Sequence, residues 1–269
     1  MPEGHTLHRL AGELQELVGE RVSAASPQGR FPAAAVDGAV VAAVEAYGKH
    51  LLVDLAEHPT VHVHLGMRGK LLRFAPVTGA PMPQVRLRLA TADVAWDLIA
   101  PSTCEPLDAA GRERLLAGLG PDPLRAGPLH PDILPRGADA AEARRRLRAS
   151  RGSVGVALMD QSVLAGVGNV FRAEILHALR IAPERPASRV SDTEFDALWS
   201  GLAAMMGQAV EDGRIITVDV PAGEDRLAVP EAVSRRVYRR DACADCGTPV
   251  VTTTLQGRTS YACPRCQPD

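Results

Sequence analysis

Two paired cysteine motifs near the end of the chain carry the clearest chemical signal. Four of the five cysteines lie in the last 27 residues, as Cys243 and Cys246, a spacer of 16 residues, and then Cys263 and Cys266. Four thiolates at this spacing can surround one Zn²⁺ tetrahedrally, and such a closed site is structural rather than catalytic. Residues 252–255 and 260–261 have the composition of two strands joined by a turn at 256–258. We therefore expect a zinc ribbon with one structural Zn²⁺, rather than two disulfides or four unrelated cysteines.

The turn of this expected ribbon carries Arg258 at its tip. A zinc ribbon by itself most often only stabilises the fold, but it also indicates a nucleic-acid partner. The fifth cysteine, Cys104, has no partner in the sequence, and we interpret it as a small packing residue rather than a nucleophile.

The start of the chain, Met1-Pro2-Glu3, is the second candidate site. Removal of Met1 would leave Pro2 as a secondary amine, and the reference pKa of an α-amino group is about 8, so a useful fraction is unprotonated near neutral pH. Such an amine can attack an aldehyde-like carbon and form an iminium, which is an electron sink for later bond breaking. Glu3 beside it could transfer protons during ring opening. Taken alone, the two residues are an ordinary start-codon context.

Lys49 lies where an apolar strand begins, in the segment 47–52. Burying the charge of a lysine at such a place costs free energy unless the charge has a partner, which favours a phosphate-binding or active-site role. A strand-end lysine that reaches water is an equally good interpretation of this segment alone. Further along, His62 and His64 alternate onto one strand face, and we interpret them as structural because the sequence offers no third metal ligand nearby.

Gly66 and Gly69 bracket a short turn that presents Met67. Met67 can serve as an apolar wedge between bases, or it can pack under the loop. A second glycine-rich stretch, residues 160–171, ends in Asn169 and opens a predicted helix. Its backbone N–H groups and the positive end of the helix dipole suit a phosphate, although a plain turn between helices has the same composition.

Hydrophobic periodicity divides the chain into a β-rich half and a helical half. An amphipathic helix is expected at 6–18, and a period near two marks strands at 40–46, 51–55, 61–65, 70–74, 85–89 and 94–99. Six short strands at this spacing favour a β-sandwich. Helices are expected at 108–119, 138–149, 154–159, 170–179 and 191–210, the last opened by a capping box of Ser191 and Glu194.

Five prolines between residues 120 and 137 indicate a linker between the two halves. The predicted fold class is thus α+β multidomain, with an N-terminal β-sandwich with flanking helices and a helical domain followed by a zinc-ribbon hairpin. The expected boundaries are 1–120 for the sandwich, 121–137 for the linker, 138–235 for the helical domain and 236–269 for the zinc finger.

The net charge of −2 does not by itself indicate a nucleic-acid partner. Local clusters do so better: five arginines lie within 141–152 and four within 235–240, although a solvated helix face explains the first cluster equally well. No run of about 18 apolar residues could span a bilayer, and the N-terminus lacks the features of a signal peptide. We therefore expect a cytoplasmic protein, nucleoid-associated in a bacterium, in a reducing compartment that suits zinc thiolates.

Together these segments resemble the formamidopyrimidine-DNA glycosylase and endonuclease VIII (Fpg/Nei) family of base-excision repair enzymes. The likeness runs from end to end of the chain. It consists of Pro-Glu-Gly at 2–4, Gly-Lys-His-Leu at 48–51, His-Leu-Gly-Met at 64–67, Leu-Gly-Pro-Asp-Pro-Leu at 119–124, Ala-Gly-Val-Gly-Asn-Val-Phe at 165–171, and the closing cysteine hairpin with Gly-Arg at 257–258.

The resemblance implies a bifunctional DNA glycosylase/AP lyase, with a helix-two-turn-helix motif in its C-terminal domain. Pro2 would attack C1′ of the damaged nucleotide and form a Schiff base, and Glu3 would act on the sugar ring oxygen. Lys49 would assist catalysis and bind a phosphate. The remaining implied roles are phosphate binding by Asn169 and Arg258, the latter also tied to δ-elimination, and filling of the gap left by the flipped nucleotide by Met67.

Two departures from the family pattern bear on the substrate. This chain has His5-Thr6 where many members have Pro-Glu, and the segment 213–235 lacks the Gly-Gly-Thr-Thr stretch of the 8-oxoguanine-type branch. Both features are more like the endonuclease VIII branch, which prefers oxidised pyrimidines. The expected partner is double-stranded DNA with a damaged base or an abasic site, bound by a monomer.

Three alternatives differ in what they require of these residues. An 8-oxoguanine- or formamidopyrimidine-preferring glycosylase would use the same residues on another lesion. A non-catalytic binder of damaged DNA would tolerate the loss of Pro2 or Glu3, and both are present. A zinc-ribbon metalloenzyme would need an open coordination position, which four thiolates do not leave.

Overall fold

The computed structural model describes residues 2–126 and 139–268. The chain divides into two compact units, Met1–Gly118 and Leu119–Asp269, which we call the β unit and the helical unit. Most of the expected linker, residues 127–137, lies outside the described residues, and so does Ala138 of the first expected helix of the helical half. The exact domain boundaries therefore stay a prediction.

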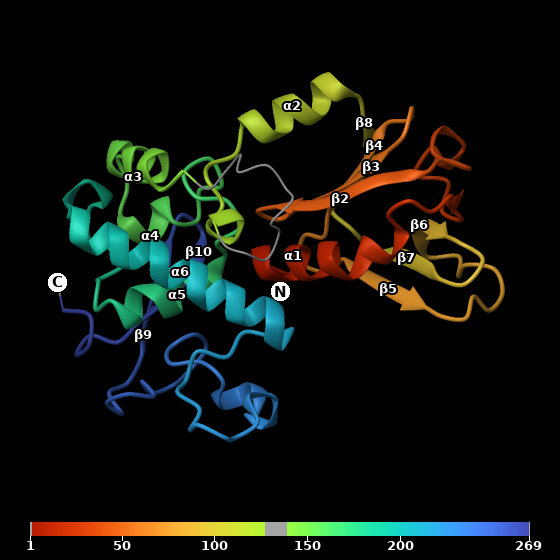
Figure 1. Ribbon diagram of the computed structural model, residues 1–269. Helices are drawn as coiled ribbons and strands as arrows, with labels where there is room; N and C mark the ends of the chain where they lie inside the picture. The colour runs from red at the N-terminus through yellow and green to blue at the C-terminus, as the bar shows by residue number, and fades with distance from the viewer. Residues whose placement is uncertain (1, 127–138, 269) are drawn as a thin grey trace. The chain divides into compact units, whose positions relative to one another are not determined.

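In the described part of the β unit, two four-stranded antiparallel sheets enclose one apolar core (Figure 1). One sheet has the strand order β1-β6-β7-β5 and the other β2-β3-β4-β8. The strands are β1 (Ser23–Ala25), β2 (Val41–Tyr47), β3 (His50–Leu55), β4 (Thr60–His64), β5 (Lys70–Phe74), β6 (Val85–Ala90), β7 (Ala95–Ile99) and β8 (Thr103–Leu107). The predicted β-sandwich is confirmed, with the six expected strands in place and β1 and β8 in addition.

Helix α1 (Gly4–Glu13) supplies part of this core and packs against β2. Its apolar side chains recur every three to four residues, and Leu7, Ala11 and Leu14 are at most 2% exposed. The helix begins two residues earlier than periodicity predicts, directly after Glu3, and a 3₁₀ turn continues it to Leu17. The second helix of the unit, α2 (Ala109–Ala117), begins after Asp108, whose carboxylate accepts a hydrogen bond from the Gly111 N–H.

The helical unit has its own core, formed by four described helices and the cysteine hairpin. The elements are α3 (Ala140–Ala149), α4 (Val154–Ala157), α5 (Asn169–Ala178), α6 (Asp192–Asp212), β9 (Val251–Leu255) and β10 (Arg258–Ala262). The predicted capping box is confirmed, because the Ser191 hydroxyl and the Glu194 carboxylate bond each other's backbone N–H groups. Cys243 and Cys263 belong to the same apolar core as α5 and α6, so the hairpin folds as part of this unit.

The β9–β10 hairpin corrects one detail of the sequence interpretation. Its turn consists of two residues, Gln256 and Gly257, with φ of 45° and 74°, the pairing that a type I′ hairpin turn requires. Arg258 is thus the first residue of β10 and not part of the turn. None of the described helices has the length and apolar character needed to cross a membrane.

Candidate active site and zinc centre

Pro2 and Glu3 lie at the N-terminus of α1. Pro2 is half-buried, whereas Glu3 is fully buried and occupies the position that caps the helix. The Thr6 N–H donates to the Glu3 carbonyl over 2.9 Å, which closes the first helical turn. The α1 helix therefore holds a carboxylic acid inside the protein at the residue next to the expected amine.

Lys49 lies in the two-residue turn of the β2–β3 hairpin, between the paired residues Tyr47 and His50. Gly48 takes the first central position of this turn with φ of 57°, a conformation that favours glycine. Lys49 is half-buried, and its charge contributes to lowering the pKa values of both His50 and His64. The motif at 48–51 thus presents a lysine beside two histidines.

A third histidine lies beside His62 and His64, which the sequence analysis interpreted as structural. His50 on β3 lies beside them, with Nδ1 2.8 Å from His62 Nε2, and His62 Nδ1 is 3.0 Å from Glu105 Oε1. Burial, reinforced by the other two histidines and Lys49, lowers the pKa of His50 to about 3. The sequence interpretation missed His50 because the strand pairing that brings it to His64 is a tertiary feature.

These histidines do not form a metal site. Among the described residues, only the four cysteines gather three or more ligand atoms within 4.8 Å of one another. Cys104, on β8, is also buried, and burial raises the pKa of its thiol to about 12, which agrees with a packing role.

Met67 projects from the turn after β4 and is 75% exposed. Ser102 supports the base of this turn: its hydroxyl lies 2.8 Å from His64 Nδ1 and donates to the His64 carbonyl over 2.9 Å, while its N–H donates to the same carbonyl over 3.0 Å. Gly66, at φ of 65°, packs so closely on Ser102 that an added Cβ would lie 2.8 Å from the serine Cβ. The turn that carries the exposed methionine is therefore hydrogen-bonded and closely packed at its base.

In the helical unit, Asn169 opens α5 and lies close to the strand that begins with Arg258. The Asn169 side-chain N–H donates to the carbonyl of Thr259 over 3.0 Å. Arg172, 1% exposed, donates to the same carbonyl over 2.8 Å and also to the Asn169 side-chain oxygen. One buried arginine, which the sequence interpretation missed, thus ties Asn169 to Thr259, the residue that follows Arg258.

A cavity of about 410 Å³ lies beside this network and is lined by Arg151, Arg172 and Arg258. Arg151 and Arg258 make no hydrogen bond or ion pair with other described residues through their side chains. The neighbouring arginines of the 141–152 cluster differ, because most are engaged within the protein, such as Arg144 with Asp192 and Asp196. The cluster that looked uniform in the sequence thus leaves Arg151 available for an anion.

The four paired cysteines come together as predicted. Sγ–Sγ distances are 3.5 Å for Cys246–Cys263, 3.6 Å for Cys246–Cys266 and 4.0 Å for Cys243–Cys266. A tetrahedron with Zn–S bonds of about 2.3 Å has edges of about 3.8 Å, so this arrangement fits one Zn²⁺. Each pair makes the same tight turn, with the N–H of Gly247 bonded to the Cys243 carbonyl and that of Gln267 to the Cys263 carbonyl.

Comparison with known proteins defines the class to which this fold and these sites belong. Residues 1–98 match the formamidopyrimidine-DNA glycosylase N-terminal domain, and residues 119–220 match the formamidopyrimidine-DNA glycosylase H2TH domain. Over its whole length the fold is similar to the crystal structure of Lactococcus lactis formamidopyrimidine DNA glycosylase bound to DNA containing an AP site, with a TM-score of 0.77 at 19% identity and coverage of 100% of both chains.

The sequence relatives are closer. Endonuclease 8 1 of Mycobacterium tuberculosis is 41% identical over 278 residues, which cover 99% of this chain and 100% of that protein. The formamidopyrimidine-DNA glycosylase of Halorhodospira halophila is 32% identical, with 99% and 98% covered. The chain therefore belongs to the formamidopyrimidine-DNA glycosylase and endonuclease VIII family, the DNA glycosylase/AP lyases of base-excision repair. Within that family, its similarity is greater to this endonuclease 8 than to this formamidopyrimidine-DNA glycosylase.

Proposed function

We propose that this protein removes oxidised bases, pyrimidines above all, from double-stranded DNA through a Schiff base on Pro2, and then cuts the abasic strand by β,δ-elimination. The observation that carries this proposal is the N-terminal arrangement. An amine-bearing residue directly precedes a fully buried carboxylic acid, and both lie where α1 begins. The positive end of the helix dipole disfavours a protonated amine there, so it favours the nucleophilic form.

The chemistry follows from these two groups. With Met1 removed, the Pro2 nitrogen bonds to C1′ while the bond from C1′ to the damaged base breaks, and the amine proton leaves with the base. Glu3 gives a proton to the ring oxygen as the C1′–O4′ bond opens, which leaves an iminium between Pro2 and C1′. Loss of a proton from C2′ then expels the 3′ phosphate, and a second elimination expels the 5′ phosphate. Lys49 is assigned to assist these proton transfers and to hold a phosphate.

The helical unit supplies contacts to the DNA backbone in this proposal. Asn169 would bind a phosphate beside the lesion at the start of α5, and Arg258 would clamp another. Support comes from the arginine-lined cavity beside Arg258, since guanidinium groups bind phosphate through paired N–H donors. Met67 would fill the space left in the duplex when the damaged nucleotide is flipped out, and its 75% exposure on a supported turn suits this task.

The substrate preference rests on the endonuclease VIII features. His5-Thr6 follows the N-terminal motif, and the segment 213–235, which carries short 3₁₀ turns at Arg226–Ala228 and Glu231–Val233, lacks the Gly-Gly-Thr-Thr stretch. The 41% identity to an endonuclease 8 supports the same branch. We therefore propose that the protein acts on oxidised pyrimidines and does so as a monomer.

A panel of duplex oligonucleotides tests this assignment, each with one thymine glycol, dihydrouracil, 8-oxoguanine, formamidopyrimidine or abasic site. We expect faster excision of the two pyrimidine lesions and strand products with phosphates at both ends. Faster excision of the purine lesions would reverse the substrate assignment. Binding to all the lesion duplexes without any cleavage would instead identify a non-catalytic damage-binding protein.

A further inference from the structure

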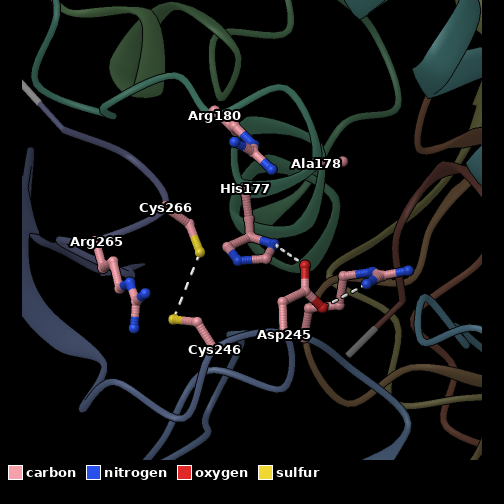
Figure 2. Close-up of a pocket in the computed structure, with 8 residues that line it drawn as sticks. His177, Ala178, Arg180, Asp245, Cys246, Arg265 and Cys266 are labelled. Carbon is pink, nitrogen blue, oxygen red and sulfur yellow. Dashed lines mark hydrogen bonds and ion pairs between the residues drawn. The ribbon is translucent and has the colours of Figure 1, made fainter.

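A cavity of about 490 Å³ opens beside the cysteine cluster (Figure 2). Cys246 and Cys266 line it and are half-buried, whereas Cys243 is 3% exposed. His177, from the last turn of α5, forms another part of the cavity wall and is 2% exposed. The cluster therefore has one side toward the cavity and another, at Cys243, that is closed to water.

The His177 ring is directed at a buried sulfur of this cluster. Its Nε2 lies 3.2 Å from Cys243 Sγ, within hydrogen-bond distance for sulfur. Zinc requires Cys243 as a thiolate, which can only accept, so in the zinc-loaded protein the imidazole N–H is the donor. A buried anionic sulfur without access to water needs such a donor from the protein.

The hairpin also supplies donors from its own residues, including backbone N–H groups of Asp245 and Cys246 near Cys243. The Thr248 hydroxyl lies 3.3 Å from Cys246 Sγ, and the Cys266 N–H donates to Cys263 Sγ over 3.4 Å. His177 differs from these donors because it comes from a helix 66 residues earlier in the chain. The His177–Cys243 bond therefore ties the metal site to the helix that begins with Asn169.

Charged groups lie near the other ring nitrogen, Nδ1, which has no hydrogen-bond partner among the described residues. Asp245 Oδ2 lies 3.9 Å from His177 Nδ1 (Figure 2), whereas Nε2 is the ring nitrogen near Cys243. Asp245 is held in turn by Arg236, which also pairs with Asp219 and donates to the carbonyl of Thr217 over 2.9 Å. The imidazole therefore makes its hydrogen bond through Nε2 to Cys243, and the paired Asp245 and Arg236 lie on its Nδ1 side.

We propose that His177 is an outer-shell partner of the zinc: its Nε2–H donates to the Cys243 thiolate, slows the loss of the metal and anchors the hairpin to α5. Four thiolates around Zn²⁺ carry a net charge of −2, and an N–H donor stabilises that charge on the side that water cannot reach. Groups that hydrogen-bond to metal ligands commonly change metal affinity by about 10- to 100-fold when they are removed.

Competition for zinc between the full-length protein and a chromophoric chelator tests this role. We compare the wild type with His177→Phe, which keeps a flat ring and removes the donor, and with His177→Gln, which keeps an N–H donor. Leu176→Val is the matched control, since it removes buried volume from the adjacent residue of α5 and no hydrogen bond. We expect His177→Phe to hold zinc about 10-fold more weakly or worse, His177→Gln to recover part of this loss, and the control to match the wild type.

The cobalt(II)-substituted proteins give a readout that a purely structural role would not change. Removal of an N–H donor from a thiolate moves its sulfur-to-metal charge-transfer absorption to longer wavelength, so His177→Phe should shift this band and Leu176→Val should not. An unchanged band together with wild-type zinc retention in His177→Phe would overturn the proposal.

A measurement on the unmodified protein keeps the inference falsifiable if His177→Phe does not fold. The ¹⁵N chemical shifts of the His177 ring in the zinc-loaded protein should show a protonated Nε2. An unprotonated Nε2 would rule out the donor role. None of these readouts involves DNA, so the proposal can fail or hold independently of the proposed enzymatic function.

Discussion

Replacement of Arg172 by methionine should lower both the stability of the helical unit and its affinity for DNA. The guanidinium is 1% exposed and donates to the Thr259 carbonyl and to the Asn169 side-chain oxygen. Methionine keeps most of the length and apolar volume of the side chain but offers no donor. The Asn169 oxygen then loses its partner in a site where Asn169 is 8% exposed, while the Thr259 carbonyl keeps the bond from the Asn169 N–H.

The expected magnitude follows mainly from these two bonds, because the further bond from Arg172 to the Gly155 carbonyl is long, at 3.5 Å. Hydrogen bonds from a charged donor each contribute about 1.5–3 kcal/mol, and recovered apolar packing offsets part of the loss, so we expect a loss of about 2–4 kcal/mol. For a unit of this size that corresponds to a fall in Tm of roughly 5–15 °C. Loss of a fixed orientation at Asn169 should weaken binding to an abasic-site analogue about 10-fold, which is about 1.4 kcal/mol.

The assay is thermal unfolding together with fluorescence anisotropy on a duplex containing a tetrahydrofuran abasic analogue. Arg145→Met is the matched control, because it removes the same charge from a side chain that is 69% exposed and that pairs, among the described residues, only with Glu142 on its own helix. An exposed pair of this kind contributes at most about 1 kcal/mol. Wild-type Tm and wild-type DNA affinity in Arg172→Met would refute the assigned role.

Three further changes test other parts of the site. Ser102→Ala removes the hydroxyl contacts with His64 and should lower the free energy of unfolding by about 1 kcal/mol. It should also reduce the fluorescence rise of 2-aminopurine placed beside a lesion, by less than Met67→Ala does. An unchanged rise would show that the turn does not depend on the Ser102 hydroxyl. Arg258→Ala should lower the slope of log affinity against log salt by about 0.9, as expected for one lost phosphate contact, and an unaltered slope would exclude that contact. Folding lowers the pKa of His50 from 6.5 to about 3, so between these pH values the unfolded chain takes up a proton that the folded chain does not. The contribution of His50 to stability is therefore fully present above about pH 6.5 and is lost as the pH drops toward 3. Urea unfolding at about pH 7 and pH 5 should show this loss of stability, and His50→Phe should make the loss smaller.

The parts of the fold that periodicity and spacing encode locally could be predicted from the sequence. The cysteine pairs, the capping box at Ser191 and the six predicted strands of the sandwich depend on residues close together in the chain. The strands that were missed carry weak local signals. β1 (Ser23–Ala25) has three residues without apolar alternation, and β8 contains Pro106, which an edge strand tolerates because it lacks a partner on one side.

The missing parts of the site depend on contacts between distant segments. Arg172 acts through Thr259, 87 residues away, and in the sequence it is an ordinary charge on a helix. Ser102 and His64 are 38 residues apart, and their contact needs the position of β8 beside β4. His177 likewise reaches Cys243 only because α5 packs against the hairpin. Tertiary packing decides which side chains orient the functional groups. Sequence motifs therefore identify the functional residues but not the residues that hold them in place.

The most direct test of the proposed chemistry is to map the covalent link to DNA. Borohydride is added while the enzyme acts on an abasic duplex, and the reduced adduct is digested with trypsin and sequenced by mass spectrometry. The proposed mechanism predicts deoxyribose on the nitrogen of Pro2, in a peptide without Met1, and loss of the adduct in Pro2→Gly. A sugar attached to Lys49 or Lys70, the two lysines of the chain, or an active enzyme that retains Met1, would contradict it.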